Sequence, residues 1–160
     1  MYGGKFLPFH KGHNYCVQVA AKECDTVYVI LFWGGCDEER IRAQHPETYL
    51  SVEARESQLY QICESNNHLA RIIPATIDIS GLRLPDGTED WDAETPLVRA
   101  VLGNRLDAVY SSEKSYDAYF KRAYPEAVHR LVDVPRIHWP ISGTMVRGMN
   151  TEEERDKWTI

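Results

Sequence analysis

The hydrophobic pattern of the chain alternates between buried strands and amphipathic helices. Residues 25–33 are almost all apolar, are rich in β-branched and aromatic side chains, and end at Gly34-Gly35. This pattern predicts a strand that is buried on both faces, as in a parallel sheet. Residues 13–23 before it carry apolar side chains at helical spacing. The chain therefore opens with strand, glycine turn, helix and strand, which predicts a right-handed βαβ unit.

The remaining pattern continues this alternation. Helices are predicted over 51–65, 97–102, 115–123 and 151–158, and strands over 69–77, 107–110 and 128–132. Residues 80–94 are rich in Gly, Pro and Asp and predict a long loop, while 34–49 are interpreted as a mobile lid that carries Arg40 and Arg42. The order of elements predicts an α/β fold with a Rossmann-like, doubly wound parallel sheet. The length predicts one domain over residues 1–160.

Composition narrows the function without defining it. A hydrophobic fraction of 43% is enough to build a core, and the net charge of −6 argues against nucleic-acid binding, which normally needs a basic surface. The chain shows neither a signal peptide nor an apolar stretch of 18 residues, so we expect a cytoplasmic protein without a membrane partner. The four cysteines lack metal-ligand spacing. The sequence leaves open whether the chain forms a homo-oligomer.

The first candidate for chemistry is the segment Gly3-Gly4-Lys5-Phe6-Leu7-Pro8-Phe9-His10-Lys11-Gly12-His13. Its glycines allow a close approach between backbone and ligand, because no Cβ intervenes. His10 and His13 lie three positions apart at the predicted start of a helix, so they share one face of its first turn. A helix start favours anions, and imidazoles beside it suit a polyphosphate.

The second candidate is Ile141-Ser142-Gly143-Thr144-Met145-Val146-Arg147. It has the form of a Ser/Thr-rich helix start followed by a basic residue. Ser142 is also a typical N-cap residue, a role that is compatible with donating a hydrogen bond to phosphate.

Together these two segments resemble the signature motifs of the nucleotidyltransferase superfamily that carries a His-x-Gly-His motif. Within it, the chain is similar to nicotinamide-nucleotide adenylyltransferases of the archaeal and bacterial NadR type. The similarity includes the glycine-lysine opening, Trp91 where those enzymes hold an aromatic residue against nicotinamide, residues 109–113, and Ser142-Gly143-Thr144 with Arg147. A departure is the first strand, since only Met1 and Tyr2 precede the glycines.

The resemblance implies the nucleotidyltransferase fold and transfer of AMP from ATP to nicotinamide mononucleotide (NMN), which gives NAD and pyrophosphate. It implies catalytic roles in charge stabilisation for His10, His13, Lys5 and Arg147. ATP and its phosphates would be bound by Gly3, Gly4, Phe6, Gly12, Ser142, Gly143 and Thr144. The nicotinamide nucleotide would be bound by Trp91, Ser111 and Arg42. Mg²⁺ would arrive with ATP and bridge phosphate oxygens, without a dedicated set of protein ligands.

Other interpretations stay open at this point. The chain could instead be another adenylyl- or cytidylyltransferase of the same superfamily, such as a pantetheine-phosphate adenylyltransferase, since these share the phosphate motifs. It could also be a sensor that binds nucleotide without turnover. Trp91 is nearly as compatible with simple packing as with ring stacking. Arg55 is interpreted as one half of a structural ion pair with Glu56 or a nearby Asp.

Overall fold

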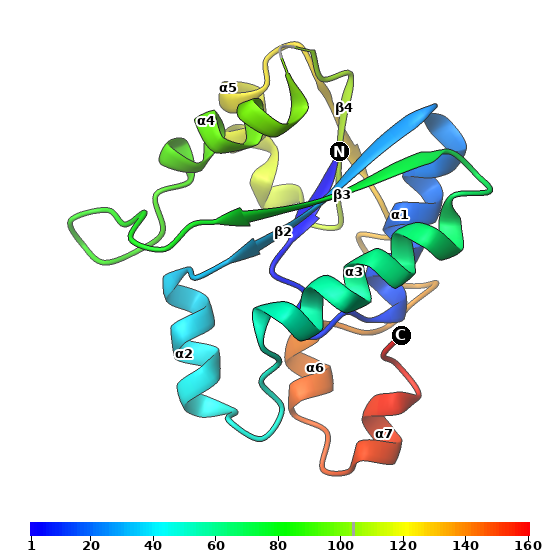
Figure 1. The fold of residues 1–160 in the computed structure, drawn as a ribbon, viewed down its shortest axis with the longest axis vertical. Coiled ribbons are helices and arrows are strands. Elements are labelled where there is room, and N and C mark those ends of the chain that lie inside the picture. Colours follow the sequence, from blue (N-terminus) through cyan, green and yellow to red (C-terminus); the bar gives the residue numbers. More distant parts are fainter. Residues whose placement is uncertain (104) are drawn as a thin grey trace.

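The computed structural model describes residues 1–103 and 105–160 and contains a five-stranded parallel sheet covered by helices on both faces (Figure 1). The strands are β1 (Tyr2–Gly4), β2 (Thr26–Trp33), β3 (Arg71–Asp78), β4 (Ala108–Ser111) and β5 (Val128–Leu131). Their spatial order is β3-β2-β1-β4-β5, and all neighbouring pairs are parallel. The connectivity reverses direction between β1 and β4, which is where such sheets bind ligands. The predicted doubly wound α/β fold is confirmed.

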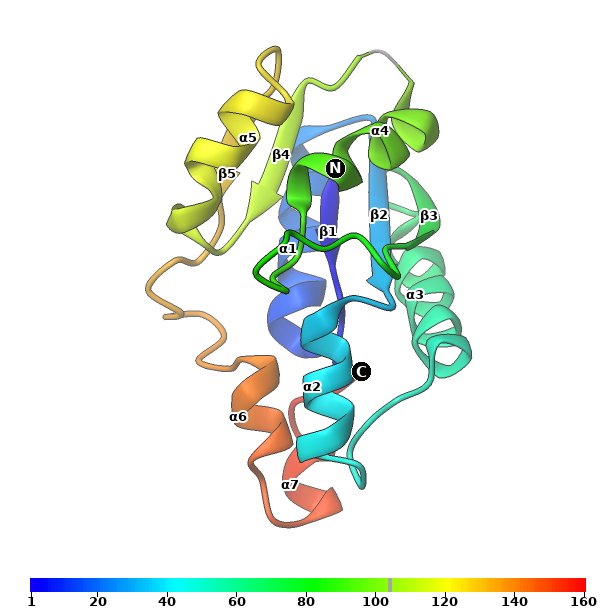
Figure 2. The same ribbon diagram turned by 90° about the vertical axis from the view of Figure 1, so that its left-hand side faces the viewer.

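The helices divide into two layers and a third group at one end of the sheet. They are α1 (Lys11–Glu23), α2 (Cys36–Gln44), α3 (Val52–Asn66), α4 (Trp91–Leu102), the 3-10 turn η1 (Lys114–Tyr116), α5 (Asp117–Ala123), α6 (Gly143–Arg147) and α7 (Glu152–Asp156). α1 and α3 cover one face, α4 and α5 cover the other, and α2, α6 and α7 lie beyond the C-terminal ends of the strands (Figure 2). This third group therefore frames the edge where the ligand site is expected.

The core consists of two apolar clusters, one on each face of the sheet. Val29 and Leu31 of β2 point into the cluster under α1 and α3, whereas Ile30 between them points into the cluster under α4 and α5. All three side chains are fully buried. The prediction of a strand buried on both faces is therefore confirmed, and the alternation explains why β2 reads as a continuous apolar run.

Two segments predicted as loops contain helix. Residues 36–44 form α2, whose apolar face is weak but whose first turn carries three acidic residues that complement the helix dipole. Residues 34–49 therefore contain a helix, and the interpretation of this segment as a mobile lid stays a prediction. α4 begins at Trp91 instead of residue 97, because the Asp90 carboxylate caps it by accepting from the Ala93 N–H at 3.0 Å. Pro96 lies inside this helix, which is why the pattern suggested a later start.

The first strand has three residues and depends on its neighbours. Tyr2 pairs with Val29 on one side and with Tyr110 on the other, and the Met1 amino group donates to the carbonyl of Ala108 at 2.7 Å. A Cβ added at Gly3 would come within 2.7 Å of a ring carbon of Phe32. Glycine is thus required here by the packing of the adjacent strand.

A buried ion pair ties the C-terminal edge of the sheet together. The Arg55 guanidinium on α3 is fully buried and donates to Glu38 of α2 at 2.5 Å and to the Lys5 carbonyl, just after β1, at 2.9 Å. Glu38 also accepts from the Tyr49 hydroxyl at 2.8 Å and the Gly34 N–H at 3.0 Å. The predicted structural ion pair of Arg55 is confirmed, but its partner is Glu38 of α2 and not Glu56 or a nearby Asp.

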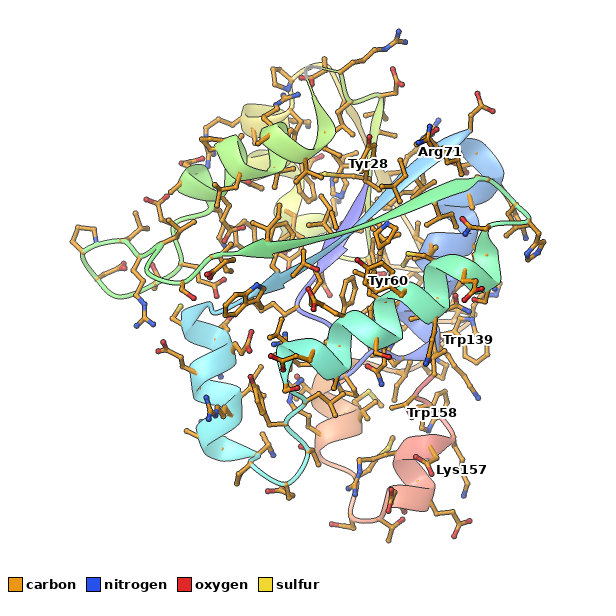
Figure 3. The ribbon with its side chains drawn as sticks, viewed as in Figure 1. Tyr28, Tyr60, Arg71, Trp139, Lys157 and Trp158 are labelled. Atoms are coloured by element: carbon orange, nitrogen blue, oxygen red, sulfur yellow. The ribbon has the colours of Figure 1, made fainter. Side chains whose placement is uncertain are left out.

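Removing one side of this pair should strongly destabilise the protein. Glu38→Ala leaves a buried guanidinium without its anion, so we expect the free energy of unfolding to fall by about 3–5 kcal/mol. Urea denaturation followed by circular dichroism measures this. Lys157→Ala is the matched control, since Lys157 forms only an exposed pair with Glu153 on the far end of the chain (Figure 3), and it should change stability by less than about 0.5 kcal/mol. Equal effects would contradict the role given to Glu38.

Candidate active site

A cavity of about 390 Å³ lies at the C-terminal edge of the sheet and spans the point where the strand order reverses. Its lining includes the residues of β1, the turn into α1, the end of β4, and the start of α6. Ten of the predicted site residues line it: Gly3, Gly4, Lys5, His10, Gly12, His13, Trp91, Ser111, Ser142 and Gly143. The fold thus gathers residues from both predicted motifs and from the middle of the chain.

Two stacked imidazoles form one end of the cavity. The rings of His10 and His13 lie with centroids 3.5 Å apart and planes within 20° of parallel. His10 is the N-cap residue of α1, so its extended backbone turns the chain from β1 into the helix. Tyr2 and Phe9 flank the His13 ring at centroid distances of 6.4 and 5.5 Å and fix its position.

Both histidines are neutral at physiological pH, and their hydrogen bonds define one tautomer. Burial, with the Arg136 guanidinium nearby, lowers the pKa of His10 to about 4, and burial beside His10 holds the pKa of His13 well below its usual value. The backbone N–H of His10 donates to His13 Nδ1 at 3.2 Å, so the ring proton of His13 is on Nε2. His10 Nδ1 is buried without a hydrogen-bond partner in the described part of the chain. Both imidazoles line the cavity, so a ligand there would lie beside them.

Lys5 also lines this cavity, and its ammonium is held by two carboxylates. Its ammonium binds the Glu89 carboxylate at 2.6 and 2.7 Å and Asp37 of α2 at 3.0 Å. Burial opposes its charge, but the hydrogen bonds to these carboxylates outweigh burial and raise the Lys5 pKa. The lysine is thus fixed and cationic, and it orders the loop before α4.

The second motif, residues 141–147, contributes Ser142 and Gly143 to the cavity wall. The Ser142 hydroxyl caps α6 by accepting from the Met145 N–H at 3.2 Å, and Gly143 follows at the cavity wall. A Cβ on Gly143 would lie 3.1 Å from the Leu7 carbonyl oxygen, so glycine keeps α6 against the first motif. Arg147 reinforces this contact by donating to the same Leu7 carbonyl and, at 3.1 Å, to the Thr144 hydroxyl.

Aromatic side chains line the other end of the cavity. Trp91 packs edge-on against Tyr116 and Tyr119, with centroids 5.0 and 5.2 Å apart. Ser111 at the end of β4 also faces the cavity, and its hydroxyl is 2.8 Å from His129 Nε2. An elongated ligand in this cavity would meet polar groups at one end and ring faces at the other.

Four predicted site residues lie outside the cavity lining. Phe6 is buried in the core, where it stacks on Phe9 at 3.8 Å. Arg42 is exposed on α2 and lies over the Tyr49 ring at 5.4 Å. Thr144 and Arg147 follow Gly143 in α6, and the Arg147 guanidinium donates to the Thr144 hydroxyl. The structure brings these last two close to the site and places Phe6 and Arg42 in other surroundings.

The sequence did not single out several charged residues of the cavity, among them Arg136 and Glu94. Arg136 lies in an irregular segment with a positive φ of 51°, and it bridges the Ile141 carbonyl and Glu113 at 2.7 and 2.9 Å. Glu94 lines the aromatic end from α4. A helix starting at Trp91 would have placed Trp91, Glu94 and Val98 on one face, but Arg136 carries no local signal.

The carboxylates of the cavity do not form a metal cage. Within residues 1–103 and 105–160, no group of three or more His, Cys, Asp or Glu side chains is arranged to hold a metal ion. Asp37 and Glu89 are already bound to Lys5. This donor set fits a divalent ion that is held mainly by the phosphates of a ligand. In the same described residues, every helix is too short or too polar to cross a membrane.

The chain is similar in sequence to curated proteins of NAD biosynthesis. The chain is 29% identical over 148 residues to the trifunctional NAD biosynthesis/regulator protein NadR of Escherichia coli (strain K12), and 28% identical to that of Salmonella typhimurium (strain LT2). Each match covers 90% of this chain and 35% of the relative. The chain therefore spans about a third of the length of the curated relatives it matches. No protein-family model matches the chain.

Solved structures agree with the sequence comparison. A crystal structure of NadR protein in complex with NAD and AMP-PNP superposes with a TM-score of 0.65 at 25% identity, over 98% of this chain and 43% of the other. A bifunctional NMN adenylyltransferase/ADP ribose pyrophosphatase from Francisella tularensis has a TM-score of 0.60 at 19% identity, over 96% and 43%. The chain thus has the nucleotidyltransferase fold. Within that class it is related to the NadR proteins, which confirms the predicted resemblance.

The buried histidine pair should make stability depend on pH. Because the pKa of His10 falls from 6.5 to about 4 on folding, the unfolded chain binds its proton first, and the folded state loses stability as the pH falls through this window. We expect the stability advantage of the wild type over His10→Gln to shrink by about 3 kcal/mol between pH 7 and pH 4. Urea unfolding across this pH range measures it, with His68→Gln on the surface as the control. A difference that is constant with pH would contradict the assignment.

Proposed function

We propose that this chain transfers AMP from ATP to nicotinamide mononucleotide, giving NAD and pyrophosphate. The observation that carries the proposal is one cavity with a histidine-rich phosphate end, built from the turn between β1 and α1, and an aromatic end at Trp91. NAD and AMP-PNP are the molecules bound in the related NadR crystal structure. Together they contain phosphate groups, which suit the histidine end, and a pyridine ring, which suits the aromatic end.

The reaction needs positioning and charge stabilisation more than proton transfer. An oxygen of the 5′-phosphate of the mononucleotide forms a bond to the α-phosphorus of ATP, and the bond from that phosphorus to the bridging oxygen breaks, releasing pyrophosphate. The attacking phosphate is already ionised, so no general base is required. Two groups held in line in one cavity react as if at high local concentration.

The neutral histidines suit this chemistry. His13 Nε2–H donates a hydrogen bond toward negative charge that grows on the phosphate oxygens during the step. Arg136, Lys5 and the α6 segment with Arg147 would add positive charge around the polyphosphate. Mg²⁺ bound with ATP would supply further charge neutralisation at the phosphate oxygens, and no protein carboxylate is assigned to it.

A coupled assay tests the proposal directly. Purified protein is mixed with ATP, Mg²⁺ and the mononucleotide, and alcohol dehydrogenase reduces any NAD formed to a species that absorbs at 340 nm. A signal that requires all three components supports the proposal. Folded protein that gives no signal would overturn it. Parallel reactions with 4′-phosphopantetheine would then reveal a different acceptor, and calorimetric binding of ATP without turnover would reveal a nucleotide sensor.

Loss of the His13 imidazole should slow turnover without unfolding the protein. We expect His13→Ala to lower kcat by about 100-fold or more, as is typical when one electrostatic stabiliser is removed. The coupled assay measures kcat, and circular dichroism verifies the fold. His68→Ala removes an exposed histidine and should leave kcat unchanged. Wild-type turnover in His13→Ala would remove this residue from the mechanism.

Replacing Trp91 should weaken the binding of the mononucleotide and leave the binding of ATP nearly unchanged. We expect Trp91→Ala to raise KM for the mononucleotide at least tenfold and KM for ATP less than twofold, because ring stacking and burial are worth about 1–2 kcal/mol. Trp91→Phe keeps an aromatic face and should show a smaller rise. Equal changes in both KM values would mean that Trp91 supports the fold of the cavity and does not bind the pyridine ring.

A further inference from the structure

Glu94 is a buried carboxyl group without a polar partner. It lies on α4, one turn after Trp91, and lines the aromatic end of the cavity with 9% of its surface exposed. Its Oε1 atom is fully buried and has no hydrogen-bond partner in the described part of the chain. Trp91 and Val98 occupy the same face of the helix and also line the cavity. A buried carboxyl oxygen in the wall of a cavity is costly as long as it has no hydrogen-bond partner.

The charges around Glu94 do not neutralise it. Glu89 and Asp90 from the preceding loop add negative charge, while Tyr119 and Tyr124 approach from α5 and its end. Among the described residues, Lys5, which follows β1, is the cation that lowers the pKa of Glu94, but its ammonium is bound to Glu89 and Asp37. Burial, with the help of Glu89, therefore raises the pKa of Glu94 to about 7.

A pyridine mononucleotide would supply the missing partner. Its ring carries a positive charge at the glycosidic nitrogen, and nicotinamide adds an amide group with two N–H donors. Nicotinate carries a carboxylate in the same position, which has acceptors only. Two carboxylates that approach each other in a buried site cannot both stay ionised at low cost.

Building on the proposed function, we propose that Glu94 selects nicotinamide mononucleotide over nicotinate mononucleotide by accepting a hydrogen bond from the carboxamide and repelling the carboxylate. Trp91 stacks on the pyridine ring of both compounds and therefore raises the affinity for both. Glu94 causes the difference in affinity between them. The selectivity then depends on one residue that does not touch the reacting phosphates.

The chemistry of the amide and the acid sets the expected size of the effect. When a buried polar group of a protein binds a polar group of the substrate, an analogue without that group leaves the protein group unpaired. The kcat/KM for such an analogue is lower by a large factor. We expect the wild type to use nicotinamide mononucleotide at least 100-fold better than nicotinate mononucleotide, measured as kcat/KM at pH 8. At pH 6, where Glu94 is mostly protonated and its O–H can donate to a carboxylate, this ratio should fall at least threefold.

Glu94→Gln is the decisive variant. Its amide has nearly the shape of the carboxyl group, offers an oxygen to the carboxamide and an –NH₂ to the carboxylate, and does not titrate. We expect kcat/KM for nicotinamide mononucleotide to fall several-fold, kcat/KM for nicotinate mononucleotide to rise, and their ratio to drop at least tenfold and lose its pH dependence. Asp92→Asn is the matched control, because Asp92 is exposed on the same helix and pairs with Arg122. It should keep the wild-type ratio.

The outcomes separate this inference from the proposed function. An unchanged ratio in Glu94→Gln, or a wild type that prefers the nicotinate compound, overturns the role of Glu94 while dinucleotide formation stands. If the wild type makes neither dinucleotide, the proposed reaction is wrong, and calorimetric binding of the two mononucleotides decides the role of Glu94. Tighter binding of the nicotinamide compound that is lost in Glu94→Gln supports it; equal affinities or an absence of binding overturn it.

Discussion

The buried guanidinium of Arg55 holds together the three segments that meet beyond the sheet. It reaches from α3 to the Lys5 carbonyl after β1 and to Glu38 on α2, and Glu38 in turn holds the turn after β2 through Gly34. A short β1 could not by itself fix the direction in which the chain leaves the sheet. Because a buried charge without its partner is costly, the network stabilises the arrangement in which these segments meet. The Lys5 carbonyl that Arg55 binds belongs to the same residue whose ammonium binds Glu89 and Asp37.

The two ends of the cavity differ in the side chains that line them. One end presents two neutral imidazoles, Arg136 and the glycine-rich backbone, and the other presents aromatic faces with Glu94 among them. Burial drives the protonation states at both ends in the same direction, toward the neutral form: it lowers the pKa of the histidines and raises the pKa of Glu94. A bound dinucleotide would bring negative phosphates to the first end and a positive ring to the second, so each end gains a charge that it lacks.

The side chains of Trp139 and Trp158 illustrate how the C-terminal part of the chain supports the histidine turn. Both are labelled in the view that draws side chains as sticks (Figure 3). The Trp158 carbonyl accepts from the Lys11 N–H at 2.8 Å, and the Lys11 ammonium lies 5.9 Å from the centre of the Trp139 ring. These contacts occupy the first turn of α1 on the side away from His13. The last residues therefore help to hold the helix whose start carries the proposed phosphate site.

The sequence by itself determined the parallel sheet, the order of its elements and the two motifs, because apolar periodicity and glycine-rich turns are local properties. It also indicated His10, His13, Ser142 and Trp91, all of which line one cavity. It missed the helical character of residues 36–44 and 91–96, where capping and dipole effects outweigh a weak apolar pattern. Only the tertiary structure decided that Arg136 and Glu94 join the cavity and that Phe6 and Arg42 do not. The reason is physical: whether a charged side chain is buried, paired or left without a partner depends on segments that are distant in sequence.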